Sequence, residues 1–117
     1  VVEDNIVNQK ILVAIIKKLG HTAVTADNGS VAVELAKNKQ FDFVWMDCQM
    51  PIMDGFDATR LIRNFLPYKD TPIVAVTANA LSQDERNCIS AGMSGFLVKP
   101  VNRNAVERVV EKWISSQ

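Results

Sequence analysis

Acidic, hydroxyl and basic side chains follow four short apolar runs of this chain, where they could act on one ligand. In chain order they are Glu3 and Asp4, Asp47, Thr77 and Lys99. If the runs are parallel strands of one sheet, their carboxyl ends meet at the edge where open α/β sheets bind ligands. One acid after a strand is usually a turn former or a helix cap. The joint occurrence of all five is what predicts a site.

The chemistry predicted for these side chains is phosphoryl transfer with a divalent cation. Three carboxylates brought together repel one another, and a hard cation removes that cost. Mg²⁺ suits such a site, because it takes oxygen ligands and keeps several waters. Asp47 would then be a carboxylate nucleophile that forms an aspartyl-phosphate, with Mg²⁺ and Lys99 neutralising charge. The Thr77 hydroxyl could donate to a phosphoryl oxygen.

The elements that must position these residues are five repeats of a short strand followed by a helix. The expected strands are residues 1–2, 22–26, 43–46, 73–76 and 96–98, and apolar residues at helical spacing follow each of them. Strands that are apolar on both faces indicate a parallel sheet covered by helices on both sides, which is an α/β fold. Ser30 is expected to cap the second helix and Asn102 or Asn104 the last one. Two residues are too few for a central strand, so we expect the first strand to be truncated and the chain to be a fragment of a longer protein.

Length and composition indicate one globular domain over residues 1–117, with 48% apolar and 22% charged residues. Thirteen basic residues balance thirteen acidic ones, which argues against direct binding of nucleic acid. The longest apolar run, residues 11–16, is far too short for a membrane span. Cys48 and Cys88 have no metal or redox spacing, and we expect reduced, buried thiols and a cytoplasmic location.

Four stretches resemble the response-regulator receiver domain of two-component phosphorelays. They are residues 1–5 (VVEDN), 46–55 (MDCQMPIMDG), 76–80 (VTANA) and 99–100 (KP). The resemblance implies a flavodoxin-like (βα)5 three-layer sandwich with a parallel sheet in the order 2-1-3-4-5. It also implies the following roles: Asp47 as phosphoacceptor from a phosphohistidine; Glu3, Asp4, Asp47 and the backbone carbonyl of Gln49 as Mg²⁺ ligands; Lys99 as the phosphate-pairing cation; and Thr77 and Phe96 as the switch pair. The bond between Lys99 and Pro100 is commonly cis in such domains.

The subtype that the resemblance favours is the receiver of a hybrid sensor histidine kinase. Residues 5–10, Gln49 and residues 77–80 are similar to such receivers, which pass phosphate to a histidine phosphotransfer domain. The expected partners are therefore a histidine kinase or a histidine phosphotransfer domain. We also expect a homodimer to form, if one does, through the fourth helix, fifth strand and fifth helix.

Three alternatives stay open at this point. The chain could be the receiver of a response regulator with a separate output domain. It could be a Mg²⁺-dependent phosphatase, although such enzymes typically carry a second acid where this chain has Gln49. It could also be a degenerate receiver that only binds proteins, which the presence of all five site residues disfavours.

Overall fold

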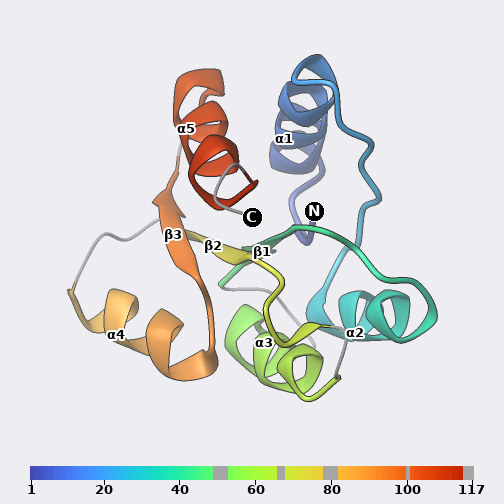
Figure 1. The fold of residues 1–117 in the computed structure, drawn as a ribbon, viewed down its shortest axis with the longest axis vertical. Helices are drawn as coiled ribbons and strands as arrows, with labels where there is room; N and C mark the ends of the chain where they lie inside the picture. Colours follow the sequence, from blue (N-terminus) through green and yellow to red (C-terminus); the bar gives the residue numbers. More distant parts are fainter. Residues whose placement is uncertain (49–52, 66–67, 78–81, 100, 115–117) are drawn as a thin grey trace.

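The fold has three layers, with a parallel sheet between two layers of helices (Figure 1). The structure, a computed structural model, describes residues 1–48, 53–65, 68–77, 82–99 and 101–114. The strands are β1 (Val44–Asp47), β2 (Ile73–Thr77) and β3 (Gly95–Val98), hydrogen-bonded in that order. The helices are α1 (Ile6–Lys18) and α5 (Arg103–Ile114) on one face, and α2 (Gly29–Asn38), α3 (Gly55–Arg63) and α4 (Ser82–Ala91) on the other.

Two single parallel bridges extend the sheet beyond β1. Val2 bridges Met46 on one side and Ala26 on the other. The spatial order is therefore Ala26, Val2, β1, β2 and β3, which confirms the expected order 2-1-3-4-5. The expected strand over residues 22–26 is wrong as an element, because only Ala26 forms a bridge. Its neighbour in the sheet is just the short segment around Val2, so there is too little chain alongside to form a ladder.

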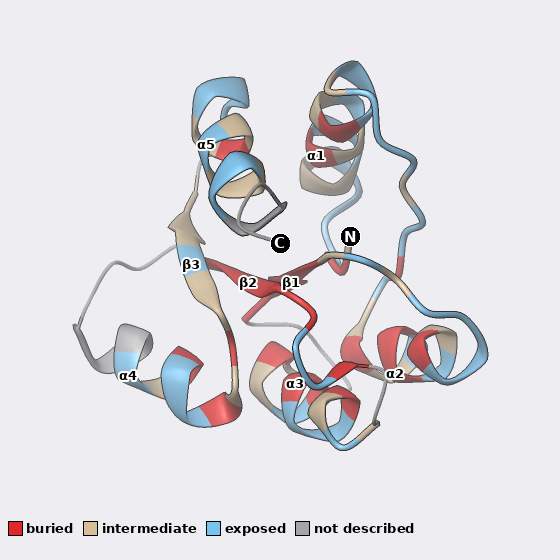
Figure 2. Ribbon diagram, viewed as in Figure 1, coloured by how far each residue is buried: buried red, intermediate tan, exposed pale blue. Residues whose placement is uncertain are grey.

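The strands are buried on both faces, as their continuous apolar character predicts. Every residue of β1 and β2 is buried, whereas β3 is partly exposed (Figure 2). Met46 packs into the core between the sheet and α2, α3 and α4, and Trp45 packs into the core on the side of α1 and α5. Because successive side chains of a strand alternate in direction, this pattern also sends Cys48 into the first core.

Polar side chains cap the helices and fix where they begin. Asn5 accepts a hydrogen bond at the start of α1, Asp54 does so at α3, and Asn102 accepts from Ala105 at the start of α5. The expected cap at Ser30 is wrong. Asn28 caps α2 instead, accepting from the backbone of Val31, so the helix starts before Ser30 is reached.

Arg63 ties the C-terminal end of α3 to two loops. Its guanidinium donates to the carbonyls of Tyr68 and Thr71, each at 2.6 Å, and to the carbonyl of Gly92 at 2.8 Å. It also donates to the Ser94 hydroxyl at 3.1 Å. One half-buried side chain thus satisfies three carbonyls from two loops, which holds the turn between α4 and β3 against α3.

Tyr68 makes a second tie, between its own loop and the loop that precedes β1. The side chain is fully buried. Its hydroxyl donates to the carbonyl of Lys39 and accepts from the backbone N–H of Phe41 at 2.9 Å. Loss of this hydroxyl would leave one donor and one acceptor without their protein partner.

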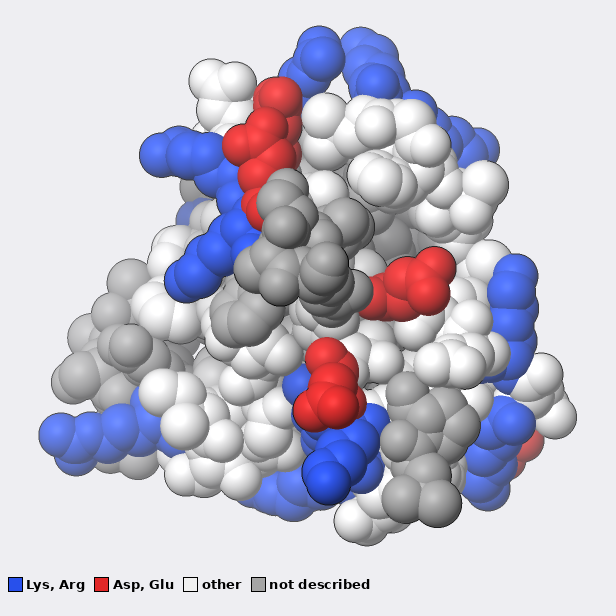
Figure 3. All heavy atoms as spheres, viewed as in Figure 1, with Lys and Arg blue, Asp and Glu red and all other residues white. Residues whose placement is uncertain are grey.

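Charged side chains of both signs lie on the face drawn in Figure 3. On the face in Figure 3, Lys and Arg side chains lie mostly around the rim, with Asp and Glu between them. Such a face carries no continuous basic stripe. No helix of the described chain is both long enough and apolar enough to cross a bilayer.

Candidate functional site

The register of the sheet brings the predicted site residues to one edge. Asp47 is the last residue of β1 and pairs with Val76, and Thr77 is the last residue of β2. Lys99 follows β3 directly, and its backbone N–H donates to the carbonyl of Thr77 at 2.7 Å. Three separate elements therefore end at the same level, because each parallel strand advances by the same rise per residue.

Three carboxylates form a tight cluster at this edge. Oxygen atoms of Glu3, Asp4 and Asp47 all lie within 4.8 Å of one another. Glu3 and Asp47 are only 4% and 3% exposed, whereas Asp4 is exposed. The cluster therefore opens to solvent on the Asp4 side, and two of its carboxylates are largely removed from water.

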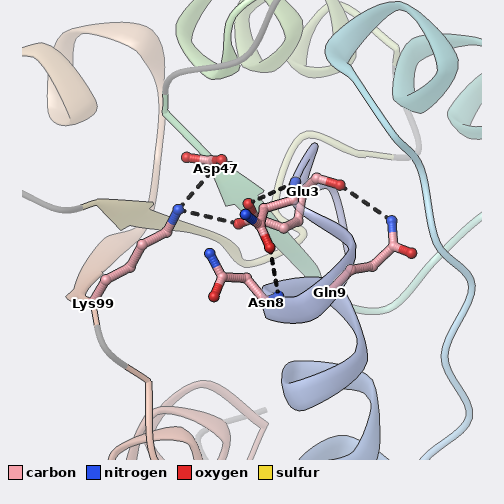
Figure 4. A network of polar contacts seen from close by, with 6 residues as sticks. Glu3, Asn8, Gln9, Asp47 and Lys99 are labelled. Carbon is pink, nitrogen blue, oxygen red and sulfur yellow. Dashed lines mark hydrogen bonds and ion pairs between the residues drawn. The ribbon is translucent and has the colours of Figure 1, made fainter.

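Lys99 lies between the two buried carboxylates (Figure 4). Its Nζ is 3.3 Å from Glu3 Oε2 and 3.5 Å from Asp47 Oδ2. Burial by itself would lower the pKa of the Lys99 ammonium, but the charges of Asp47 and Glu3 outweigh burial and raise that pKa above its ordinary value. One ammonium among three carboxylates leaves two negative charges, which matches the charge of one divalent cation.

The loop that carries Glu3 is held by two amide groups that sequence reasoning missed. The backbone N–H of Asn5 donates to Glu3 Oε1 at 3.2 Å. The Gln9 side chain donates at 3.1 Å both to the Glu3 carbonyl (Figure 4) and to Asp27 Oδ1. Gln9 and Asp27 are far apart in sequence, so no local pattern could have indicated this contact. It ties the loop before α1 to the loop before α2.

Of the remaining predicted residues, the structure describes Thr77 and Phe96 but not Gln49 and Pro100. Thr77 is buried at the end of β2, next in sequence to the residue that pairs with Asp47. Phe96, on β3, is 36% exposed, so the expected switch aromatic lies at the surface. Gln49 and Pro100 lie outside the described residues, and the expected carbonyl ligand and cis bond stay predictions.

A family model described as the response regulator receiver domain matches residues 1–111. The chain belongs to this family. The match covers nearly the whole chain, and it includes the acidic cluster, Thr77 and Lys99.

The curated relatives of this receiver domain include hybrid histidine kinases. The chain is 38% identical over 117 residues to hybrid signal transduction histidine kinase A of Dictyostelium discoideum, with 97% of the chain covered. It is 36% identical over 112 residues to the signal transduction histidine-protein kinase BarA of Escherichia coli K12, with 96% covered. The matched region spans 5% and 12% of those two proteins, so the receiver corresponds to one small part of each.

Solved structures agree with the receiver fold. The receiver domain of sensor histidine kinase PA1611 from Pseudomonas aeruginosa PAO1 superposes with a TM-score of 0.91 and 41% identity, covering 97% of this chain and 93% of that one. That structure holds a magnesium ion in the active-site cleft. The receiver of Ssk1 from Saccharomyces cerevisiae, solved with the histidine phosphotransfer protein Ypd1, gives a TM-score of 0.88 and 32% identity, covering 96% of this chain and 84% of that one.

Proposed function

We propose that this receiver domain accepts a phosphoryl group on Asp47 from a phosphohistidine, in the presence of Mg²⁺, as one step of a phosphorelay. The observation that carries the proposal is the position of the Asp47 carboxylate. It is buried at the end of β1, within 4.8 Å of the Glu3 and Asp4 oxygens and 3.5 Å from the Lys99 ammonium. A nucleophile, a set of hard oxygen ligands and a charge-neutralising cation thus share one edge of the sheet.

The donor set fits Mg²⁺. Carboxylate oxygens are ligands that this ion prefers, and it binds through few protein groups while keeping water. The two negative charges left by Glu3, Asp4, Asp47 and Lys99 favour a divalent ion over none. We assign the backbone carbonyl of Gln49 as a further ligand on the family resemblance. When bound, Mg²⁺ neutralises charge on the phosphoryl oxygens.

In the transfer step, an oxygen of Asp47 attacks phosphorus in line with the leaving histidine nitrogen. The new O–P bond forms as the N–P bond breaks, and the electron pair of that bond returns to the imidazole ring. Lys99 neutralises phosphoryl charge from a position already within ion-pair distance of the acceptor. The Thr77 hydroxyl donates to a phosphoryl oxygen, and its movement lets Phe96 pack inward from its exposed position.

The partner that delivers the phosphoryl group is a histidine kinase or a histidine phosphotransfer domain. Three apolar side chains in the first half of α1, those of Ile6, Val7 and Ile11, are 59%, 65% and 44% exposed, and they follow Asp4 closely in the chain. An apolar surface on the helix that begins two residues after Asp4 suits a partner that must bring an imidazole to Asp47. Val7→Asp should slow transfer from a phosphotransfer domain without slowing phosphorylation by acetyl phosphate. Leu61→Asp, exposed in the last turn of α3, is the matched control.

A second surface could serve for output or for a homodimer. It consists of α4, β3 and α5, where Ile89 and Phe96 are 66% and 36% exposed. Thr77 and Lys99 border this surface through β2 and β3, so a phosphoryl group that draws them would change its shape. Sedimentation with and without beryllofluoride and Mg²⁺ tests whether the surface forms a dimer.

The protein that contains this domain is, in this proposal, a cytoplasmic or cytoplasm-facing hybrid sensor histidine kinase. The similarity to such kinases supports it. The assignment of residues 1–117 as one domain of such a protein rests on the small share, 5% and 12%, that the matched region takes of two of these kinases.

Incubation with acetyl phosphate and Mg²⁺, followed by intact mass, tests the function directly. We expect one phosphate adduct that is lost in Asp47→Asn and on chelation of Mg²⁺. Asp57→Asn is the matched control, because Asp57 is an exposed carboxylate at the start of α3. An adduct that persists in Asp47→Asn would contradict the proposal. Turnover of phosphate monoesters would favour a phosphatase, and we expect none.

A further inference from the structure

The structure brings together two cysteines that lie far apart in the sequence. Cys48 Sγ and Cys88 Sγ are 3.9 Å apart, and both residues are reduced. They are 3% and 2% exposed and belong to the same core, between the sheet and α2, α3 and α4. The two thiols therefore face each other across the junction between β1 and α4.

The two cysteines have different surroundings. Cys48 follows Asp47, and its backbone is fixed on both sides, since its N–H donates to the Val76 carbonyl at 3.2 Å and its carbonyl accepts from Gly55 at 3.1 Å. Cys88 lies on α4 and lines a cavity of about 290 Å³ between α4, β3 and α5. Cys88 lines this cavity and Cys48 does not.

We propose that Cys48 and Cys88 are a dithiol pair that hydrogen peroxide oxidises to an intramolecular disulfide. The Cys88 sulfur attacks the peroxide oxygen, the O–O bond breaks, and Cys88 becomes a sulfenic acid while one water is released. The Cys48 sulfur then attacks the sulfenic sulfur, the S–O bond breaks, and a second water leaves. The two thiols lose two electrons and two protons in total, and the peroxide is reduced to water.

The disulfide would couple oxidation to the switch. A disulfide has an S–S length of about 2.05 Å, so the two sulfurs must approach each other by nearly 2 Å. Because Cys48 is fixed in the sheet, the movement falls on α4. Oxidation then anchors α4 beside the strand that ends at Asp47. The consequence for phosphorylation rests on the proposed function, but formation of the disulfide does not.

The test is intact mass after treatment with a few equivalents of hydrogen peroxide. We expect the monomer to lose two hydrogen atoms, to regain them with a thiol reductant, and to melt at a temperature higher by more than about 5 °C when oxidised. Cys48→Ala and Cys88→Ala should not lose hydrogen, and Cys48→Ala should instead gain oxygen at Cys88. Thermal melts of the reduced variants check that each is folded.

Three outcomes would overturn the proposal. They are gain of oxygen by the wild-type protein without loss of hydrogen, a disulfide between two chains, and no reaction while the protein stays folded. None of these measurements involves a phosphate donor, so their failure is distinct from failure of the proposed function. If the disulfide forms, oxidised protein should show smaller amide shifts in α4 than reduced protein on addition of beryllofluoride and Mg²⁺.

Discussion

Replacing Lys99 by Met tests whether the ammonium and a divalent cation neutralise the same carboxylates. Methionine keeps most of the side-chain length and removes the charge. In the structure the ammonium lies 3.3 Å and 3.5 Å from carboxylate oxygens of Glu3 and Asp47. Each such pair is worth about 5 kcal/mol of attraction at an effective dielectric of 20, before the cost of desolvation. Breaking a fully buried pair costs about 3–5 kcal/mol.

The Lys99 side chain is 24% exposed, so the expected loss is smaller. We expect Lys99→Met to lower the free energy of unfolding by about 2–3 kcal/mol in the absence of Mg²⁺. With Mg²⁺ the difference in free energy of unfolding between wild type and Lys99→Met should be smaller, because in the variant no ammonium competes with the cation for the three carboxylates. If Lys99→Met binds Mg²⁺ ten times more tightly than wild type does, saturating Mg²⁺ would restore about 1.4 kcal/mol of its free energy of unfolding.

The assay is urea unfolding of wild type and Lys99→Met, each with a chelator and with Mg²⁺, together with calorimetric titration of Mg²⁺. Lys37→Met is the control. Lys37 pairs with Glu34 at 3.6 Å, but both side chains are more than half exposed, so its loss should stay within about 0.5 kcal/mol and not depend on Mg²⁺. Equal stabilisation of wild type and Lys99→Met by Mg²⁺ would refute the reasoning.

Two further changes test the supports of the fold. Arg63→Ala should lower the free energy of unfolding in urea by about 2–4 kcal/mol, because three carbonyls lose their hydrogen-bond donor. Arg60→Ala, on the same helix, is the control. It removes only an exposed ion pair and should lower the free energy of unfolding by less than about 0.5 kcal/mol. Tyr68→Phe should lower the free energy of unfolding by about 1 kcal/mol in the same measurement, because it leaves a part-buried N–H and a part-buried carbonyl without their protein partner. An unchanged free energy of unfolding would contradict this role of the hydroxyl.

The sequence was sufficient for those parts of the fold that depend on local pattern. The continuous apolar runs predict strands buried on both faces, and β1 and β2 are buried throughout. Their ends place Asp47 and Thr77 at one edge because parallel strands share a direction. The cap at Asn102 also follows from local chemistry, since its side chain reaches an N–H three residues ahead.

Features that depend on distances between elements could not be read from the sequence. The spacing of Cys48 and Cys88 indicates no redox pair, yet packing of α4 on the sheet brings their sulfurs to 3.9 Å. The hydrogen bonds of Gln9 join loops that meet only when the sheet forms. The segment before Ala26 has strand-forming residues, but a strand also needs a neighbouring strand of similar length, and that is a property of the sheet.

The charge balance of the site gives a physical reason for a coupled switch. Lys99 is shared between Glu3 and Asp47, and its backbone N–H is bonded to the Thr77 carbonyl. A phosphoryl group on Asp47 replaces one negative charge by nearly two, and it extends them beyond the carboxylate. The Lys99 ammonium is attracted most strongly to that charge and shifts toward the phosphoryl group. The Glu3 carboxylate then interacts with the bound cation in place of Lys99. Because Lys99 follows β3 directly and its backbone N–H is bonded to the Thr77 carbonyl, we expect a shift of its side chain to act on the end of β3. Phe96 lies on that same strand, so the redistribution of one positive charge reaches the surface made by α4, β3 and α5.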